Sequence, residues 1–242
     1  MADSIDIRLI LDVTRLIIGI LILSYASYTD IKTRRASNIL WIVLASVGGM
    51  LLLVQYLTNT FPENTIFHLI FIPIMIVLVY VMFQLRLIFG GADAKAIMAL
   101  AILLPIRPEI MGFPIWESRL PYAWVPFFNA LLIFLLIPIG LFVFNIVKKS
   151  FKFPHCFLGY KMSIQKAREN FVWPMEKIMD GKTKFIYMPK DFDIEEELKE
   201  FEKNNIDEIW VTPKIPFMIP LLAGFICAFI FGDILSQFMN LF

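Results

Sequence analysis

Two aspartates, Asp30 and Asp93, occupy the positions in this sequence that best suit catalysis. Each follows an apolar run long enough to cross a membrane, Leu9–Tyr28 for the first and Ile66–Phe89 for the second. An ionisable residue beside a transmembrane segment is costly, so a functional role is the default interpretation. Either aspartate alone is better explained by a structural role, such as an ion pair of Asp30 with Lys32 or Arg34 at a helix end. Together they form a candidate site for acid–base chemistry, because two neighbouring carboxylates can share one proton.

The residues before Asp93 add context. Gly90 and Gly91 break the chain between two apolar runs, and glycine permits backbone geometry and close approach that other residues resist. Such a break can hold a carboxylate in place and let an extended peptide approach the backbone. Many loops contain a string of this kind, but here Asp30 and Asp93 both follow odd-numbered crossings. The two carboxylates are therefore expected to face the same side of the membrane.

The composition excludes a soluble protein. Of 242 residues, 59% are hydrophobic and 18% are charged, whereas a soluble domain has about 25% charged residues. We therefore expect neither a disordered chain nor a nucleic-acid-binding protein. The two cysteines, Cys156 and Cys227, form no CxxC pair, which argues against a cysteine-based zinc site. No metal or other cofactor is expected.

Six apolar runs predict an α-helical polytopic membrane protein, since about 20 apolar residues span the bilayer core. They cover Leu9–Tyr28, Asn38–Leu57, Ile66–Phe89, Ala94–Leu104, Tyr122–Val147 and Ile215–Met239. The fourth is short. Lys and Arg are concentrated in the connections after the first, third and fifth runs, which hold eighteen of the 22, against four on the opposite side. The positive-inside rule then places the N-terminus outside and both aspartates at the cytoplasmic face.

One hydrophilic segment interrupts this pattern. We divide the chain into a membrane domain over 1–147, a cytoplasmic α+β insert over 148–213, and a last transmembrane helix over 214–242. Within the insert, Asp180-Gly181 is a typical hairpin turn, Asp191–Asn204 is expected to be a helix with Asp193 as its cap, and Ile209–Val211 is expected to be a short strand. The acidic face of that helix could attract a basic peptide, although charge runs are usually solvated surface.

Both aspartate segments resemble one family. Gly90-Gly91-Ala92-Asp93-Ala94-Lys95 resembles the GxGD-x-K signature of type IV prepilin peptidase-like aspartic proteases, with Ala92 fitting a looser form of it. Asp30–Asn38 resembles the first-aspartate segment, an Asp followed by basic residues and then an Asn. Six spans and a late cytoplasmic insert resemble the archaeal preflagellin peptidases in particular. The resemblance implies Asp30 and Asp93 as catalytic residues, with Gly90, Gly91, Ala92 and Lys95 supporting the motif.

The resemblance also implies the reaction and the substrate. We expect a membrane aspartic endopeptidase, multi-pass in the plasma membrane, that removes the short basic leader from preflagellin or type IV pilin-like precursors at the cytoplasmic face. The partners would be that precursor and the lipid bilayer. Bacterial members that also N-methylate the product often carry a cysteine-rich cytoplasmic segment, which this sequence lacks, so cleavage without methyl transfer is expected.

Two alternatives and one further hypothesis remain open. A proton-coupled transporter would use the same aspartates as a relay, and a noncatalytic scaffold for filament assembly would not need them. If the chain is a protease, helix position suggests that Asp93 is the ionised base, because it starts a helix whose dipole favours an anion. Asp30 would then carry the proton, although Lys32 or Arg34 could hold it ionised.

Overall fold

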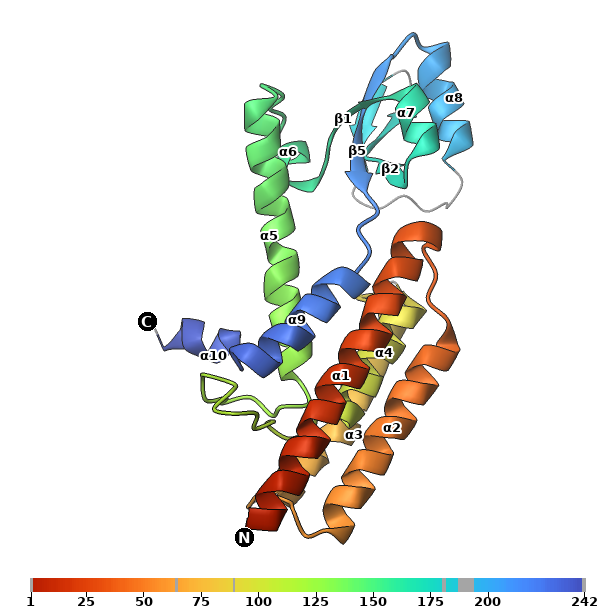
Figure 1. Cartoon of the computed structure of the whole chain (residues 1–242). Helices are drawn as coiled ribbons and strands as arrows, with labels where there is room; N and C mark the ends of the chain where they lie inside the picture. Colours follow the sequence, from red (N-terminus) through yellow and green to blue (C-terminus); the bar gives the residue numbers. More distant parts are fainter. Residues whose placement is uncertain (1, 64, 89, 180–181, 187–193, 241–242) are drawn as a thin grey trace. The chain divides into compact units, whose positions relative to one another are not determined.

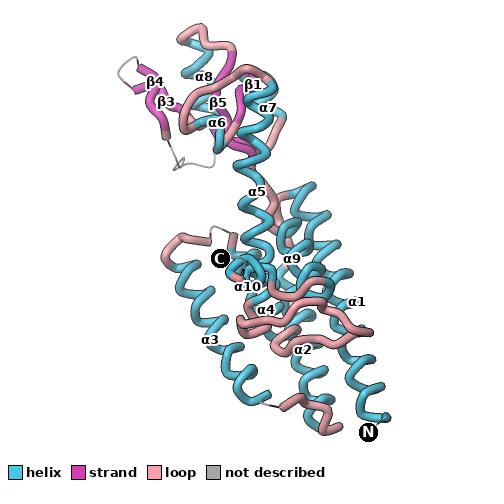
Figure 2. The backbone as a smooth tube through the Cα atoms, turned by 90° about the vertical axis from the view of Figure 1, so that its left-hand side faces the viewer, coloured by secondary structure: helices cyan, strands magenta, loops and turns pink. Residues whose placement is uncertain are grey.

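The computed structural model describes residues 2–63, 65–88, 90–179, 182–186 and 194–240. The chain divides into two compact units, one formed by 1–134 with 216–242 and the other by 135–215. The second unit begins inside a helix, since residue 135 lies within the segment 125–147. Figures 1 and 2 show the elements of both units.

Most of the first unit is helical. Its elements are α1 (Ala2–Thr33), α2 (Asn38–Leu57), α3 (Thr65–Gln84), α4 (Gly91–Leu103), the first part of α5 (Val125–Val147), α9 (Met218–Ile230) and α10 (Ile234–Met239). Four of these are long and apolar enough to cross a membrane, namely residues 7–33 of α1 together with α2, α3 and α5. Length and composition therefore support the predicted polytopic helical membrane fold.

The predicted fourth and sixth crossings differ from this pattern. Helices α4 and α9 have thirteen residues each, fewer than the roughly 20 that span the bilayer core. Helix α4 ends at Leu103, shortly before Pro105, which cannot continue it. Helix α9 ends at Ile230, and Gly232 follows with φ of 94° before α10 begins. The sixth apolar run is therefore two helices rather than one continuous span.

Helix α4 lies at the centre of the first unit (Figure 1). It contacts α2 and α3, and seven of its thirteen residues are buried. Gly48 makes the contact with α2 possible, because a Cβ there would lie 2.8 Å from the Cα of Leu103. Helix α1 contacts α2 and α9. Gly19 of α1 makes room for the Phe225 ring of α9, because a Cβ on Gly19 would lie 2.1 Å from that ring. Small residues thus let these helices approach closely.

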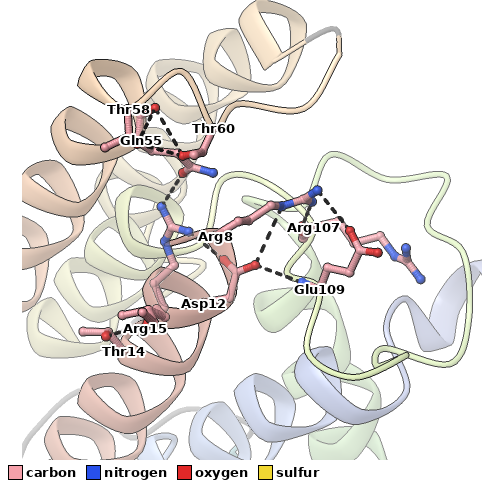
Figure 3. A network of polar contacts seen from close by, with 10 residues as sticks. Arg8, Asp12, Thr14, Arg15, Gln55, Thr58, Thr60, Arg107 and Glu109 are labelled. Atoms are coloured by element: carbon pink, nitrogen blue, oxygen red, sulfur yellow. Dashed lines mark hydrogen bonds and ion pairs between the residues drawn. The ribbon is translucent and has the colours of Figure 1, made fainter. Parts of the chain in front are cut away.

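A polar network anchors the loop that follows α4 (Figure 3). Asp12 and Arg15 are almost fully buried and form an ion pair of 2.7 Å one turn apart on α1. Arg15 also donates to the amide oxygen of Gln55 on α2, and Asp12 accepts the backbone N–H of Glu109. Arg8 pairs with the Glu109 carboxylate at 3.0 Å. These contacts join α1, α2 and the loop, and they pair the charges that burial would otherwise penalise.

Asp233 anchors the other end of that loop. It is fully buried and caps α10 by accepting the backbone N–H of Ser236. The same carboxylate accepts the Ser118 hydroxyl at 3.1 Å and the Leu120 N–H at 3.2 Å. Its role is therefore to cap a helix and hold a loop, which the apolar run around it did not indicate.

The second unit carries an α+β fold after the end of α5. Its elements are α6 (His155–Leu158), β1 (Tyr160–Ser163), α7 (Ile164–Glu169), β2 (Val172–Pro174), β3 (Glu176–Met179), β4 (Lys182–Phe185), α8 (Glu195–Lys203) and β5 (Glu208–Pro213). One antiparallel sheet has the order β1-β5-β2, and β3 pairs with β4 in a second. Leu198 and Phe201 of α8 are buried in a cluster that includes Ile209 and Val211 of β5.

The structure confirms three elements predicted for this segment. Strands β3 and β4 form the expected antiparallel pair with Met179 opposite Lys182, β5 includes the predicted strand Ile209–Val211, and α8 occupies the predicted helical region. The turn residues Asp180-Gly181 and the cap Asp193 lie outside the described residues. Two acidic residues of α8, Glu195 and Glu202, pair with Arg168, so part of the acidic face has partners within the fold.

Candidate functional site

Asp30 lies in the last turn of α1, because the helix extends past the predicted end at Tyr28 to Thr33. Asp30 is half-buried, and the backbone N–H of Met218, the first residue of α9, is among the groups that act on its carboxylate. Arg34 follows the helix with φ of 54°, and its positive charge acts on the same carboxylate. The carboxylate of Asp30 is therefore influenced by a cation that follows its own helix and by the first amide of α9.

Asp93 lies in the first turn of α4, as predicted. Its side chain folds back over Gly90, the N-cap, so that a Cβ on Gly90 would lie 2.0 Å from Oδ2 and 2.7 Å from Cγ of Asp93. The backbone of Gly90 is extended, with φ of −88° and ψ of 114°, a conformation open to any residue. Glycine is thus required here for space around the carboxylate rather than for backbone freedom.

The two aspartates lie within electrostatic reach of each other. The negative charge of Asp30 acts on Asp93. The neighbouring groups come from three helices: Asp30 from α1, Asp93 from α4 and the Met218 amide from α9. Two carboxylates that repel each other do not both ionise easily, so the charge of Asp30 makes ionisation of Asp93 harder.

Lys95 and Asn38 connect the two sequence motifs. The Nζ of Lys95, on the first turns of α4, donates to Oδ1 of Asn38 over 2.8 Å. Asn38 is the first residue of α2, and Ser37 caps that helix by accepting the Ile39 N–H. The contact ties the start of α4 to the start of α2, close in sequence to Asp93 and to the segment that follows Asp30.

The remaining motif residues are less constrained. A Cβ on Gly91 would lie 3.6 Å from the Phe83 ring, an ordinary contact, so the structure gives this glycine no steric requirement. Ala92 is half-buried and packs against the apolar core of the first unit.

Sequence reasoning missed the Met218 amide, since a backbone N–H has no signature in the residue type. Asn38 was in the quoted motif, but nothing indicated that it would bind Lys95.

His155 lies in the second unit and is buried beside Glu176, with 3.1 Å between its Nε2 and Oε1 of that residue. Lys152 also pairs with Glu176. Burial, with the charge of Lys152, lowers the pKa of His155 below its usual value. Among the described residues, no group of three or more His, Cys, Asp or Glu side chains is arranged to hold a metal ion.

Comparison with known proteins gives two family matches. Residues 17–147 match the model of the type IV leader peptidase family, and residues 151–234 match the model described as archaeal peptidase A24 C-terminus type II. The first match contains Asp30, Asp93 and the motif residues between 90 and 95. The second contains α9 and therefore the Met218 amide.

Curated relatives match over most of the chain. A preflagellin peptidase from Methanococcus voltae is 28% identical over 239 residues, which cover 89% of this chain and 94% of that protein. One from Methanocaldococcus jannaschii is 28% identical, with 93% of this chain and 97% of that protein covered. One from Methanococcus maripaludis is 29% identical, with 92% and 97% covered.

Proposed function

The chain belongs to the type IV leader peptidase family, and from this premise we propose that it is an aspartic endopeptidase whose catalytic pair is Asp30 and Asp93. The chain is a peptidase by its family and by the names of its relatives. The observation that supports the proposal is that the negative charge of Asp30, on α1, acts on Asp93, on α4.

The proposed reaction uses one water and one shared proton. The ionised aspartate takes a proton from the water as its oxygen adds to the carbonyl carbon of the scissile bond, and the protonated aspartate gives its proton to the carbonyl oxygen. The C–N bond then breaks as the first aspartate returns its proton to the leaving amine. The second recovers a proton from the tetrahedral intermediate, so the pair ends in its starting state.

The proposed substrate is preflagellin or a type IV pilin-like precursor with a short basic leader. Three relatives of this chain are named preflagellin peptidases. A membrane peptidase suits such a substrate. The apolar helix of the precursor can remain in the bilayer while its charged leader stays in water. We propose cleavage without methyl transfer, because the sequence lacks the cysteine-rich segment expected of methylating members.

We also propose that the pair faces the cytoplasm in the plasma membrane, with the N-terminus outside and the short helices α4 and α9 completing the membrane bundle. The asymmetry of Lys and Arg supports this orientation. It is tested by labelling single cysteines in intact cells and in inverted vesicles. Glu117→Cys should react with an impermeant reagent from outside only, and Lys148→Cys from inside only. The reverse pattern would refute the orientation.

Cleavage of a precursor by membranes that contain each variant tests the catalytic pair. Asp30→Asn and Asp93→Asn should each abolish cleavage, and the matched control Glu117→Gln, a carboxylate 87% exposed in its side chain, should retain it. Full activity in either aspartate variant would reject the pair. A proton-coupled transporter, which the comparisons do not favour, would instead show proton flux in liposomes that both variants lose, with no cleavage in the wild type.

A further inference from the structure

The chain reverses its direction where α5 ends. Lys149 adopts φ of 54°, and the N–H groups of Lys149 and Ser150 donate to the carbonyls of Ile146 and Asn145, each over 3.0 Å. This pattern is the Schellman motif, which ends a helix and turns the chain. Figure 1 shows α6 beside the last turns of α5 rather than beyond its end. The residues 148–154 therefore connect α5 to a helix that lies alongside it.

Two kinds of contact hold α6 against α5. The Nδ2 of Asn145, a residue 1% exposed, donates to the carbonyl of Cys156 over 3.0 Å and to that of Gly159 over 2.7 Å. The rings of Phe142 on α5 and Phe157 on α6 are stacked, with 4.4 Å between their centroids and 3° between their planes. A buried amide with its acceptors and a stacked aromatic pair favour one geometry. The position of α6 along the axis of α5 is therefore defined.

The stacked pair places α6 beside the apolar part of α5. Helix α5 has 23 residues and is long and apolar enough to cross a membrane. At 1.5 Å per residue it measures about 35 Å, against about 30 Å for the hydrocarbon core of a bilayer. Phe142 lies five residues before the last residue of the helix, which is about 8 Å along the axis. Phe157 is therefore expected near the boundary between the hydrocarbon and the headgroups.

Two further rings complete an aromatic cluster, which we define as Phe142, Phe151, Phe153 and Phe157. The Phe151 ring lies 6.2 Å from that of Phe142, and the Phe153 ring lies 6.3 Å from that of Phe157, between centroids. Phe151 is 66% exposed and Phe153 is 75% exposed. Large apolar side chains that are exposed together mark an interaction surface. Here the surface adjoins a helix that crosses the membrane, so lipid is the partner within reach.

Basic residues adjoin the exposed rings. Lys148 and Lys149 are exposed at the end of α5, and the Nζ of Lys148 lies 5.9 Å from the centroid of the Phe144 ring. Lys152 instead pairs with Glu176 of β3, so its charge is used within the fold. In the described part of the chain, neither Lys148 nor Lys149 pairs with a carboxylate. Exposed phenyl rings beside such lysines match the acyl chains and the phosphates of an anionic leaflet.

We propose that residues 148–157 bind the headgroup layer of an anionic lipid leaflet, with Phe151 and Phe153 between the lipids and with Lys148 and Lys149 against the phosphates. The contacts of Asn145 and the stacked rings fix this segment to α5. The hydroxyl of Thr212, on β5, donates to the carbonyl of Leu158, which connects the sheet to α6. The α+β fold is therefore held at the membrane surface. The inference concerns the second unit alone and does not depend on the catalytic pair.

Spin-label accessibility in the full chain tests the insertion of the rings. Phe153→Cys, Val143→Cys and Lys199→Cys are made singly in a Cys156→Ala, Cys227→Ala background, labelled, and reconstituted in vesicles of phosphatidylglycerol and phosphatidylcholine. Val143, 53% exposed on α5, reports lipid, and Lys199, exposed on α8, reports water. The label at position 153 should collide with dissolved oxygen as the label at 143 does. It should collide several-fold less than the label at 199 with a water-soluble nickel chelate.

The lipid preference of the same site tests the two lysines. A fluorescent label on Phe153→Cys is quenched by nitroxide-labelled phosphatidylglycerol or phosphatidylcholine, and the ratio of the two quenching constants gives the preference for the anionic lipid. Lys148→Gln and Lys149→Gln should each lower that ratio about fivefold at low salt. The matched pair Lys166→Gln, Lys199→Gln removes two exposed lysines of α7 and α8, and it should keep the ratio.

Three results would overturn the inference. The first is a label at position 153 that is as accessible to the nickel chelate as the label at 199. The second is equal quenching by the two lipids when both lysines are present, and the third is an equal fall of the ratio in the matched pair. None of these measurements uses precursor cleavage. Their failure would leave the proposed peptidase in place, and an active Asp30→Asn or Asp93→Asn variant would leave this lipid surface in place.

Discussion

Lys95 on α4 donates a hydrogen bond to the side chain of Asn38 on α2 over 2.8 Å. These residues lie at the ends of two separate motifs, and the bond fixes the start of α4, two residues after Asp93, to the start of α2. A contact between two flexible side chains at an exposed site contributes little by itself. Its effect is therefore expected in catalysis, through the placement of Asp93, more than in stability.

A double-mutant cycle tests this contact. Lys95→Met and Asn38→Ala should each lower the cleavage rate several-fold, and the double variant should be no worse than either single one, since all three lack the same bond. The expected coupling energy is about 1 kcal/mol. Additive losses would show that the two residues act independently. Lys199→Met, on the exposed face of α8, controls for loss of a lysine.

Gly90→Ala should inactivate the enzyme without unfolding it. The new Cβ would lie 2.0 Å from Oδ2 of Asp93, so the carboxylate must leave its position. Misplacement of a catalytic group by about 1 Å costs around 100-fold in rate. The matched variant Gly91→Ala meets no atom closer than 3.6 Å and should lose at least tenfold less activity. Equal losses in the two variants would contradict the steric role of Gly90. Thermal unfolding in detergent checks that both remain folded.

Two adjacent glycines of α2 should respond oppositely to alanine. At Gly48 the Cβ would lie 2.8 Å from the Cα of Leu103, and at Gly49 it would meet nothing within 4 Å. Gly48→Ala should therefore destabilise the bundle by about 1–3 kcal/mol through overpacking. Gly49→Ala should be neutral or stabilising by about 0.5–1 kcal/mol, because alanine is the better helix former. Unfolding in mixed micelles gives both values, and a stable Gly48→Ala variant would refute the close α2–α4 contact.

Removing one partner of the buried Asp12–Arg15 ion pair of α1 should lower the free energy of unfolding more than removing both partners. Arg15→Leu leaves Asp12 buried without its 2.7 Å partner and should cost about 3–5 kcal/mol of unfolding free energy. The double variant Asp12→Asn, Arg15→Leu should cost less, since no lone charge remains. A double variant less stable than Arg15→Leu alone would contradict this account. The measurement is unfolding in detergent at neutral pH.

The second unit should lose stability on acidification through His155. Burial and the charge of Lys152 lower the pKa of this histidine, so its neutral form is favoured in the folded state. The unfolded state, with a pKa of about 6.5, binds more protons below that value. Stability is therefore fully present above about pH 6.5 and is lost as pH falls toward the folded pKa. Unfolding of the region should depend less on pH in His155→Gln, and an unchanged pH dependence would exclude His155 as the cause.

The sequence predicted the long helices because they follow from side-chain type. Apolar runs of sufficient length indicated α2, α3 and α5, whereas the placement of Asp30 and Asp93 on one membrane face, which follows from the count of crossings, stays a prediction. The Asp180-Gly181 turn indicated the β3–β4 pair. In each case the determining interaction is local, or depends on burial alone.

What the sequence could not predict depends on contacts between distant backbones. The apolar run around Asp233 gave no sign that its carboxylate would accept the N–H of Leu120, and the Met218 amide carries no side-chain signal at all. Gly90 was singled out for backbone freedom and for close approach, and the structure shows that the group approaching it is the Asp93 carboxylate. The Asp12–Arg15 pair, by contrast, is separated by one helical turn, so its spacing could have indicated it.

Helix α1 and helix α9 are neighbours in space, although one ends at residue 33 and the other starts at 218. During synthesis, α1 is made first, and the 184 residues from 34 to 217 follow before α9 can place the Phe225 ring against Gly19. Until α9 has been made, after the whole hydrophilic segment, the contact between α1 and α9 cannot form. Synthesis from the N-terminus therefore produces the two carboxylates early and the helix that packs along α1 late.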